Sequence, residues 1–71
     1  MQQYLVTIID PAAVSTEYPQ GYTKTFQERV SRSGLALDRA LTSFLRHGGY
    51  GPNINATCRY RDFQVTIRRI D

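Results

Sequence analysis

The chain has 71 residues, 41% of them hydrophobic, and nine basic and six acidic side chains give it a formal net charge of +3. This length predicts a single domain over residues 1–71 with a thin core, and the hydrophobic content is too high for a disordered protein. No apolar run approaches the roughly 18 to 20 residues of a membrane span, and the N-terminus lacks the basic segment of a signal peptide, so we expect a cytoplasmic protein without membrane contact.

The first predicted element is a strand from Gln3 to Ile9. Its two faces are both largely apolar, with Tyr4, Val6 and Ile8 on one and Leu5, Thr7 and Ile9 on the other. Such a pattern is typical of a strand in the centre of a sheet. Pro11 follows Asp10 and ends the strand because proline has no amide hydrogen to donate.

Residues 11–21 are predicted to form a loop, in which Tyr18 to Gly21 fits a β-turn with Pro19 at its second position. The next segment, residues 22–33, allows two interpretations. The favoured one is a strand from Tyr22 to about Ser31, followed by a helix that begins at Gly34. The alternative is one long helix, although it would place Gly34 in the helix interior at a cost of about 1 kcal/mol.

The helix over residues 34–47 is the clearest element of the pattern. Its predicted apolar face consists of Leu37, Leu41, Phe44 and Leu45, with Ala40 beside them. The opposite face carries Leu35, Arg39, Thr42 and Arg46. Gly48 and Gly49 then stop the helix.

The C-terminal segment alternates twice, with a change of phase between the two runs. Residues 56–60 are apolar at even positions, whereas residues 63–67 are apolar at odd positions. A bulge or tight turn is therefore expected near Arg61 and Asp62. The segment forms either one long bulged strand or two short ones.

The two ends of the chain carry almost the same five residues, YLVTI at 4–8 and FQVTI at 63–67. We expect these segments to be neighbouring strands, because the first is apolar on both faces and the second is polar on one. The predicted fold class is α+β. It has a small antiparallel sheet of three or four strands in β-β-α-β order, the N-terminal strand central, and one helix packed on one face.

The sheet face without the helix would expose Leu5 and Ile9, surrounded by arginines. An apolar centre with a basic rim is typical of an interaction site, for a partner or for a homodimer through this open sheet face. The alternative is that Val14 and Tyr18 of the loop fold over these residues and complete the core.

Catalytic and metal-binding signatures are missing from the pattern. One histidine, His47, and one cysteine, Cys58, cannot supply the four ligands of a zinc site. The six carboxylates are scattered, and the glycine-rich segment after the helix has neither the order nor the lysine of a phosphate-binding loop. We therefore expect no enzyme, no catalytic residue, no cofactor and no metal.

Binding is the remaining class of function. Eight of the nine basic residues are arginine, a residue that anchors interfaces. In size and β-β-α-β outline the chain is similar to small phage or mobile-element proteins that block a host machine, anti-CRISPR proteins among them. The leading hypothesis is thus a modulator or inhibitor that docks on a larger protein or ribonucleoprotein complex. The alternative is a nucleic-acid-binding protein with an arginine-rich surface. The positions expected to bind the partner are Leu35, Arg39, Arg46, Arg59, Arg61 and Arg68.

Overall fold

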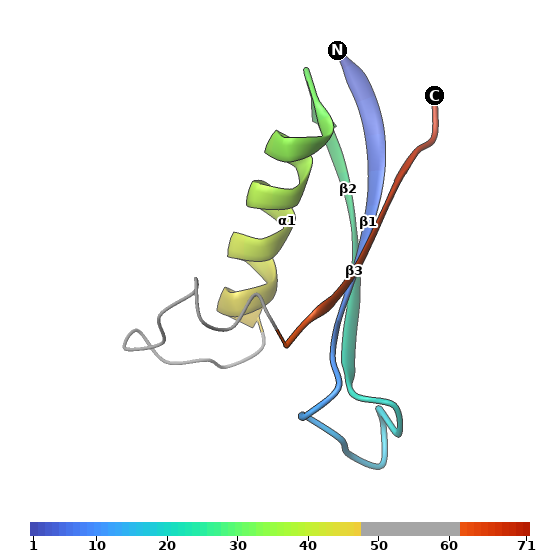
Figure 1. Ribbon diagram of the computed structural model, residues 1–71, viewed down its shortest axis with the longest axis vertical. Helices are drawn as coiled ribbons and strands as arrows, with labels where there is room; N and C mark the ends of the chain where they lie inside the picture. The colour runs from blue at the N-terminus through green and yellow to red at the C-terminus, as the bar shows by residue number, and fades with distance from the viewer. Residues whose placement is uncertain (48–61) are drawn as a thin grey trace.

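The computed structural model describes residues 1–47 and 62–71. These described residues form three strands and one helix, which follow one another along the chain as predicted (Figure 1). Their bounds are β1 Gln2–Asp10, β2 Tyr22–Val30, α1 Ser33–His47 and β3 Gln64–Arg69. No helix in this part of the chain is long and apolar enough to cross a membrane.

The three strands form one sheet in the order β2-β1-β3, and β1 is antiparallel to both neighbours. The predicted central position of the N-terminal strand is confirmed. The two similar segments lie side by side, with Val6 opposite Ile67 and Ile8 opposite Val65. The fourth strand that the sequence allowed, over residues 56–61, lies outside the described residues.

The ambiguous segment is a strand, and the long-helix alternative is wrong. All nine residues of β2 pair with β1, from Tyr22 opposite Asp10 to Val30 opposite Gln2. Threonines and aromatic residues in this segment favour an extended backbone. Helix α1 begins at Ser33, one residue before the expected start.

Helix α1 covers the sheet face that carries Val6 and Ile8, both fully buried, as predicted. Figure 1 shows the helix on one side of the sheet, and the loop between β1 and β2 beyond the end of the strands. The buried face of α1 is rotated about the helix axis relative to the apolar face expected from the sequence. Ala36 and Ala40 are fully buried, whereas Leu37 and Leu45 are only partly buried. The small alanine side chains let the helix backbone lie close to the sheet, and the leucines pack at the margins.

In the loop between β1 and β2, the ring of Tyr18 lies on the helix side of the sheet. Gly21 donates its backbone N–H to the Tyr18 carbonyl at 3.0 Å, which closes the predicted turn. The Tyr18 ring packs edge-on against Tyr22, which contacts Phe44 of α1 in turn. Val14 is 62% exposed. The alternative in which Val14 and Tyr18 close over the opposite face of the sheet is therefore not what the structure shows.

Candidate functional site

The sheet face opposite α1 has no described element packed over its centre, and we call it the open face. It is built from alternate positions of the strands: Gln3, Leu5, Thr7 and Ile9 of β1, Thr23, Thr25, Gln27 and Arg29 of β2, and Gln64, Thr66 and Arg68 of β3. These positions alternate with the residues that face α1, because successive side chains of a strand point to opposite faces.

Polar side chains cross the middle of the open face. Thr7 lies between Thr25 on β2 and Thr66 on β3, and the hydroxyls of Thr7 and Thr25 form a hydrogen bond of 3.1 Å. Leu5 and Ile9 stand on either side of this row and are half-buried. The face thus presents two separate apolar patches around a band of hydroxyl groups.

The charge of the open face is entirely basic. Arg68 lies opposite Leu5, and Arg29 lies opposite Gln3, so both arginines occupy the same end of the face. Both are exposed, and none of the strand positions that form the face is acidic. An exposed guanidinium pair with apolar surface beside it suits a partner that carries carboxylates or phosphates.

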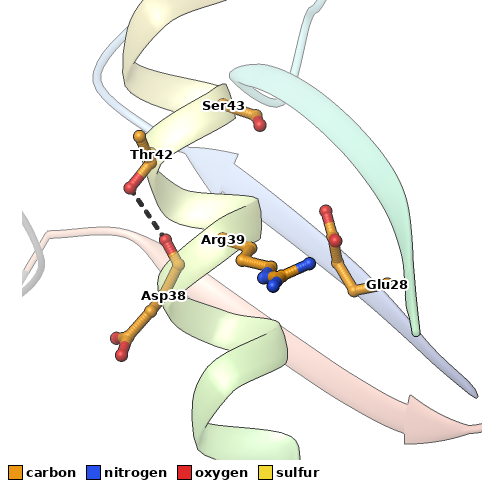
Figure 2. Close-up of a pocket in the computed structure, with 5 residues that line it drawn as sticks. All are labelled: Glu28, Asp38, Arg39, Thr42 and Ser43. Carbon is orange, nitrogen blue, oxygen red and sulfur yellow. Dashed lines mark hydrogen bonds between the residues drawn. The ribbon is translucent and has the colours of Figure 1, made fainter. Parts of the chain in front are cut away.

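A second surface lies between α1 and β2 (Figure 2). It is a shallow groove with a volume of about 410 Å³, lined by Glu28, Asp38, Arg39, Thr42 and Ser43. Arg39 points from the helix toward Glu28 on β2, whereas Asp38 points away. The Thr42 hydroxyl donates a hydrogen bond of 2.9 Å to the Asp38 carbonyl. The groove therefore brings one acidic and one basic side chain together at the border of the sheet.

The predicted partner-binding residues do not share one surface. Arg39 and Arg46 are exposed on α1, and Leu35 of the same helix is half-buried against the core. Arg68 lies on the open face, on the other side of the sheet. The remaining two positions, Arg59 and Arg61, lie outside the described residues.

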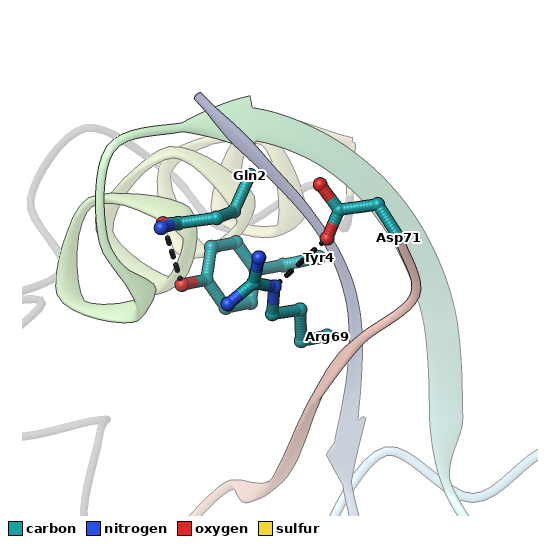
Figure 3. A network of polar contacts seen from close by, with 4 residues as sticks. All are labelled: Gln2, Tyr4, Arg69 and Asp71. Carbon is teal, nitrogen blue, oxygen red and sulfur yellow. Dashed lines mark hydrogen bonds and ion pairs between the residues drawn. The ribbon is translucent and has the colours of Figure 1, made fainter.

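The last strand ends in an ion pair on the helix side of the sheet (Figure 3). Arg69 Nε donates to Asp71 Oδ1 at 2.9 Å, and this hydrogen bond lowers the pKa of the Asp71 carboxyl below its usual value. Beside the pair, the Tyr4 hydroxyl donates to Gln2 Oε1 at 3.1 Å. Arg69 is therefore engaged within its own chain, whereas its neighbour Arg68 points to the open face.

Glu28 was not among the predicted site residues. Its place beside Arg39 follows only from the packing of the helix on an edge strand, which the strand order reveals. Within the described residues, no group of three or more histidine, cysteine, aspartate or glutamate side chains could hold a metal ion. His47 is exposed at the helix end, and Cys58 lies outside the described part of the chain.

No family model, curated protein or solved structure shows a significant match to this chain. The described surfaces, through their shape, apolar content and charge, are what indicate a function.

Proposed function

We propose that this chain is a non-enzymatic binding module of the cytoplasm, a small modulator or inhibitor that docks on a larger protein or ribonucleoprotein complex. The observation that carries the proposal is the open face. It combines half-buried Leu5 and Ile9 with exposed Arg29 and Arg68 and has no acidic position. The centre of the face is a row of threonines, so the apolar centre expected from the sequence is replaced by two apolar positions beside a polar band. Interfaces bind through such apolar contacts together with a few arginine anchors.

The composition of the open face favours a protein surface over single-stranded nucleic acid. Proteins that bind single strands stack bases on aromatic side chains. None of the strand positions that form the open face is aromatic. The described rings of Tyr22, Phe26, Phe44 and Phe63 instead pack in or against the core under α1.

The first experiment separates protein binding from nucleic-acid binding. The purified chain is titrated into fluorescent single-stranded RNA, single-stranded DNA and duplex DNA at low and at physiological salt. We expect weak binding that disappears at physiological salt, as screened charge alone would give. Binding that persists at physiological salt, or that prefers one of the three ligands, would contradict the proposal and favour the nucleic-acid alternative.

The second experiment tests the open face with matched arginine variants. Arg29→Ala and Arg68→Ala remove a charge from the open face, whereas Arg39→Ala and Arg46→Ala remove the same charge from α1. A photoreactive residue in place of Thr7 should capture a discrete protein in a lysate of the source organism. We expect Arg29→Ala and Arg68→Ala to reduce capture by tenfold or more, which corresponds to a loss of about 1.4 kcal/mol of binding free energy at an anchor residue. The two helix variants should have little effect. Equal loss in all four variants would indicate a diffuse electrostatic effect and reject the open face as the interface.

A further inference from the structure

The outer edge of β2 has no neighbouring strand among the described residues and is a surface separate from the open face. Within the described sheet, β2 is the outermost strand on its side. It is nine residues long, contains no proline, and pairs with β1 in one continuous register without a bulge. Edge strands usually contain a proline or a bulge, because an uninterrupted edge is a template for another strand.

The hydrogen-bond phase of the sheet identifies which backbone groups point outward from β2. Ile70 N donates to Gln3 O at 2.9 Å, and the register of β3 places these two residues opposite each other. Bonding alternates along an antiparallel strand, so odd-numbered residues of β1 bond to β3 and even-numbered ones bond to β2. Since Val6 is opposite Phe26, the even-numbered residues of β2 bond to β1. The outward backbone groups are those of Thr23, Thr25, Gln27 and Arg29.

We call the side of this edge that is directed to α1 its inner side. It carries a basic and an acidic residue on either side of an aromatic residue. Lys24, Phe26 and Glu28 share the face of β2 that is directed to α1. Phe26 packs against the core but remains half-buried. Lys24 Nζ lies 5.9 Å from the centre of the Tyr22 ring, and neither Lys24 nor Glu28 has an ion pair within 4.0 Å among the described residues. Along this edge, two charges thus lack an ion-pair partner in the described part of the chain, and a ring lies between them.

We propose that two copies of this chain pair through their β2 edges, antiparallel, about a twofold axis that passes between their Phe26 residues. In this register Lys24 of each copy is opposite Glu28 of the other, and Thr25 is opposite Gln27. The two Phe26 rings meet at the axis. These three inner positions form pairs of the closely spaced type, because the outward backbone groups belong to the odd-numbered residues.

Other twofold registers lose this match. If the axis lay at Lys24, the two Lys24 residues would be opposite each other, and if it lay at Glu28, the two Glu28 residues would be. Like charges opposite each other are destabilising. An axis through Thr25 pairs Lys24 with Phe26, and an axis through Gln27 pairs Glu28 with Phe26. A register with odd-numbered residues opposite even-numbered ones is also unfavourable. The outward backbone groups of one strand would then face residues whose backbone groups already bond to β1. The segment KTFQE, residues 24–28, is therefore complementary to itself in one register.

The resulting dimer is closed and differs from a contact between two open faces. The twofold axis is perpendicular to the sheet, so both copies of α1 lie on one side and both open faces on the other. Lys24 is exposed, and Glu28 borders the shallow groove between α1 and β2, so both charges are accessible to a second strand. Arg39 lines this groove beside Glu28 and stands next to the new pairs. A second copy supplies partners for the backbone groups and the charges of the edge.

Charge-reversal variants test the register. The mass of the wild-type chain in solution is measured by analytical ultracentrifugation from micromolar to millimolar concentration, and we expect a dimer. Lys24→Glu makes both inner charges negative, and Glu28→Lys makes both positive. Each variant should weaken the dimer by about tenfold or more, which corresponds to about 1.4 kcal/mol. The double variant K24E/E28K should restore it.

A mixture of the two single variants gives the sharpest result. In a mixed pair, the two glutamates on the edge of the first variant would face the two lysines on the edge of the second. The equimolar mixture should therefore form a heterodimer, although each variant alone is largely monomeric. A general loss of stability could not produce this rescue. Failure of both the mixture and the double variant to associate would overturn the proposed register.

A backbone variant tests the edge independently of charge. Gln27→Pro removes an outward N–H but leaves the hydrogen bonds between β1 and β2, so we expect a monomer with an unchanged circular dichroism spectrum. Gln27→Ala is the matched control and should dimerise. The proposal is overturned if the wild-type chain is monomeric at millimolar concentration, or if Gln27→Pro leaves the dimer intact.

Discussion

Gly21 is the position at which a single residue type is most strictly required. Its φ of +114° lies where side chains are rarely tolerated, and a Cβ atom there would collide with the backbone oxygen of Asp10. The turn that it closes carries the hydrogen bond from Gly21 to Tyr18. This turn sets the length of the β1–β2 connection and the position of Tyr18 on the helix side.

Gly21→Ala is expected to destabilise the fold by at least about 2 kcal/mol, because it adds backbone strain to a steric clash. Urea unfolding followed by circular dichroism measures the change in free energy. Gly34→Ala is the control, because nothing lies within 4 Å of a Cβ atom at this helical position. It should raise the free energy of unfolding by up to about 1 kcal/mol. A loss of the same size in both variants would show that the strain at Gly21 is not the cause.

At the scale of the elements, alternation of apolar residues predicted β1 and a strand at 63–67, whereas the helical spacing of apolar residues predicted α1 to within one residue. The strand order also followed from the sequence, because Gln64 and Arg68 are polar where Leu5 and Ile9 are apolar. The rotation of α1 could not be predicted in this way. A prediction from apolar residues directs the leucines of the helix to the sheet. In the structure, the side of the helix with the smallest side chains, Ala36 and Ala40, lies closest to the sheet.

The candidate site was predictable only in part for the same reason. A basic, partly apolar open face follows from the alternation within β1 and β3, and Arg68 lies on this face opposite Leu5. Which helix residues lie at the border of the sheet depends on the rotation of α1. The approach of Arg39 to Glu28 therefore needed the packed structure.

Ala40→Leu tests the close approach of α1 to the sheet. Ala40 is fully buried, so three additional side-chain carbons must displace the helix, at an expected cost of about 1–3 kcal/mol. Thr42→Leu adds bulk on the exposed side of the same helix and should change the free energy of unfolding by less than about 0.5 kcal/mol. Thermal unfolding of both variants measures the difference. An Ala40→Leu variant as stable as the wild type would mean that the leucine-rich side faces the sheet after all.

At the scale of the whole molecule, a chain of aromatic rings joins segments that are distant in sequence. Ring centres are 5.1 Å apart between Tyr18 and Tyr22, 5.3 Å between Tyr22 and Phe44, and 5.1 Å between Phe44 and Phe63. These contacts connect the loop, β2, α1 and the residue that precedes β3. Phe44 is the central member and is fully buried. The described elements therefore share one core, and both proposed surfaces depend on it.

Phe44→Ala should disrupt this core as a unit. A chain of this length has a total stability of about 4–10 kcal/mol, and removal of a buried phenylalanine costs about 3–5 kcal/mol. The variant is thus expected to be largely unfolded a few degrees above room temperature. Leu45→Ala, at a partly buried position of the same helix, should cost less. In the wild type, far-ultraviolet circular dichroism reports the helix and near-ultraviolet signals report the tyrosines, so one shared core requires coincident transitions. A separate, earlier transition of the tyrosines would instead show that the loop and the end of β2 open independently of α1.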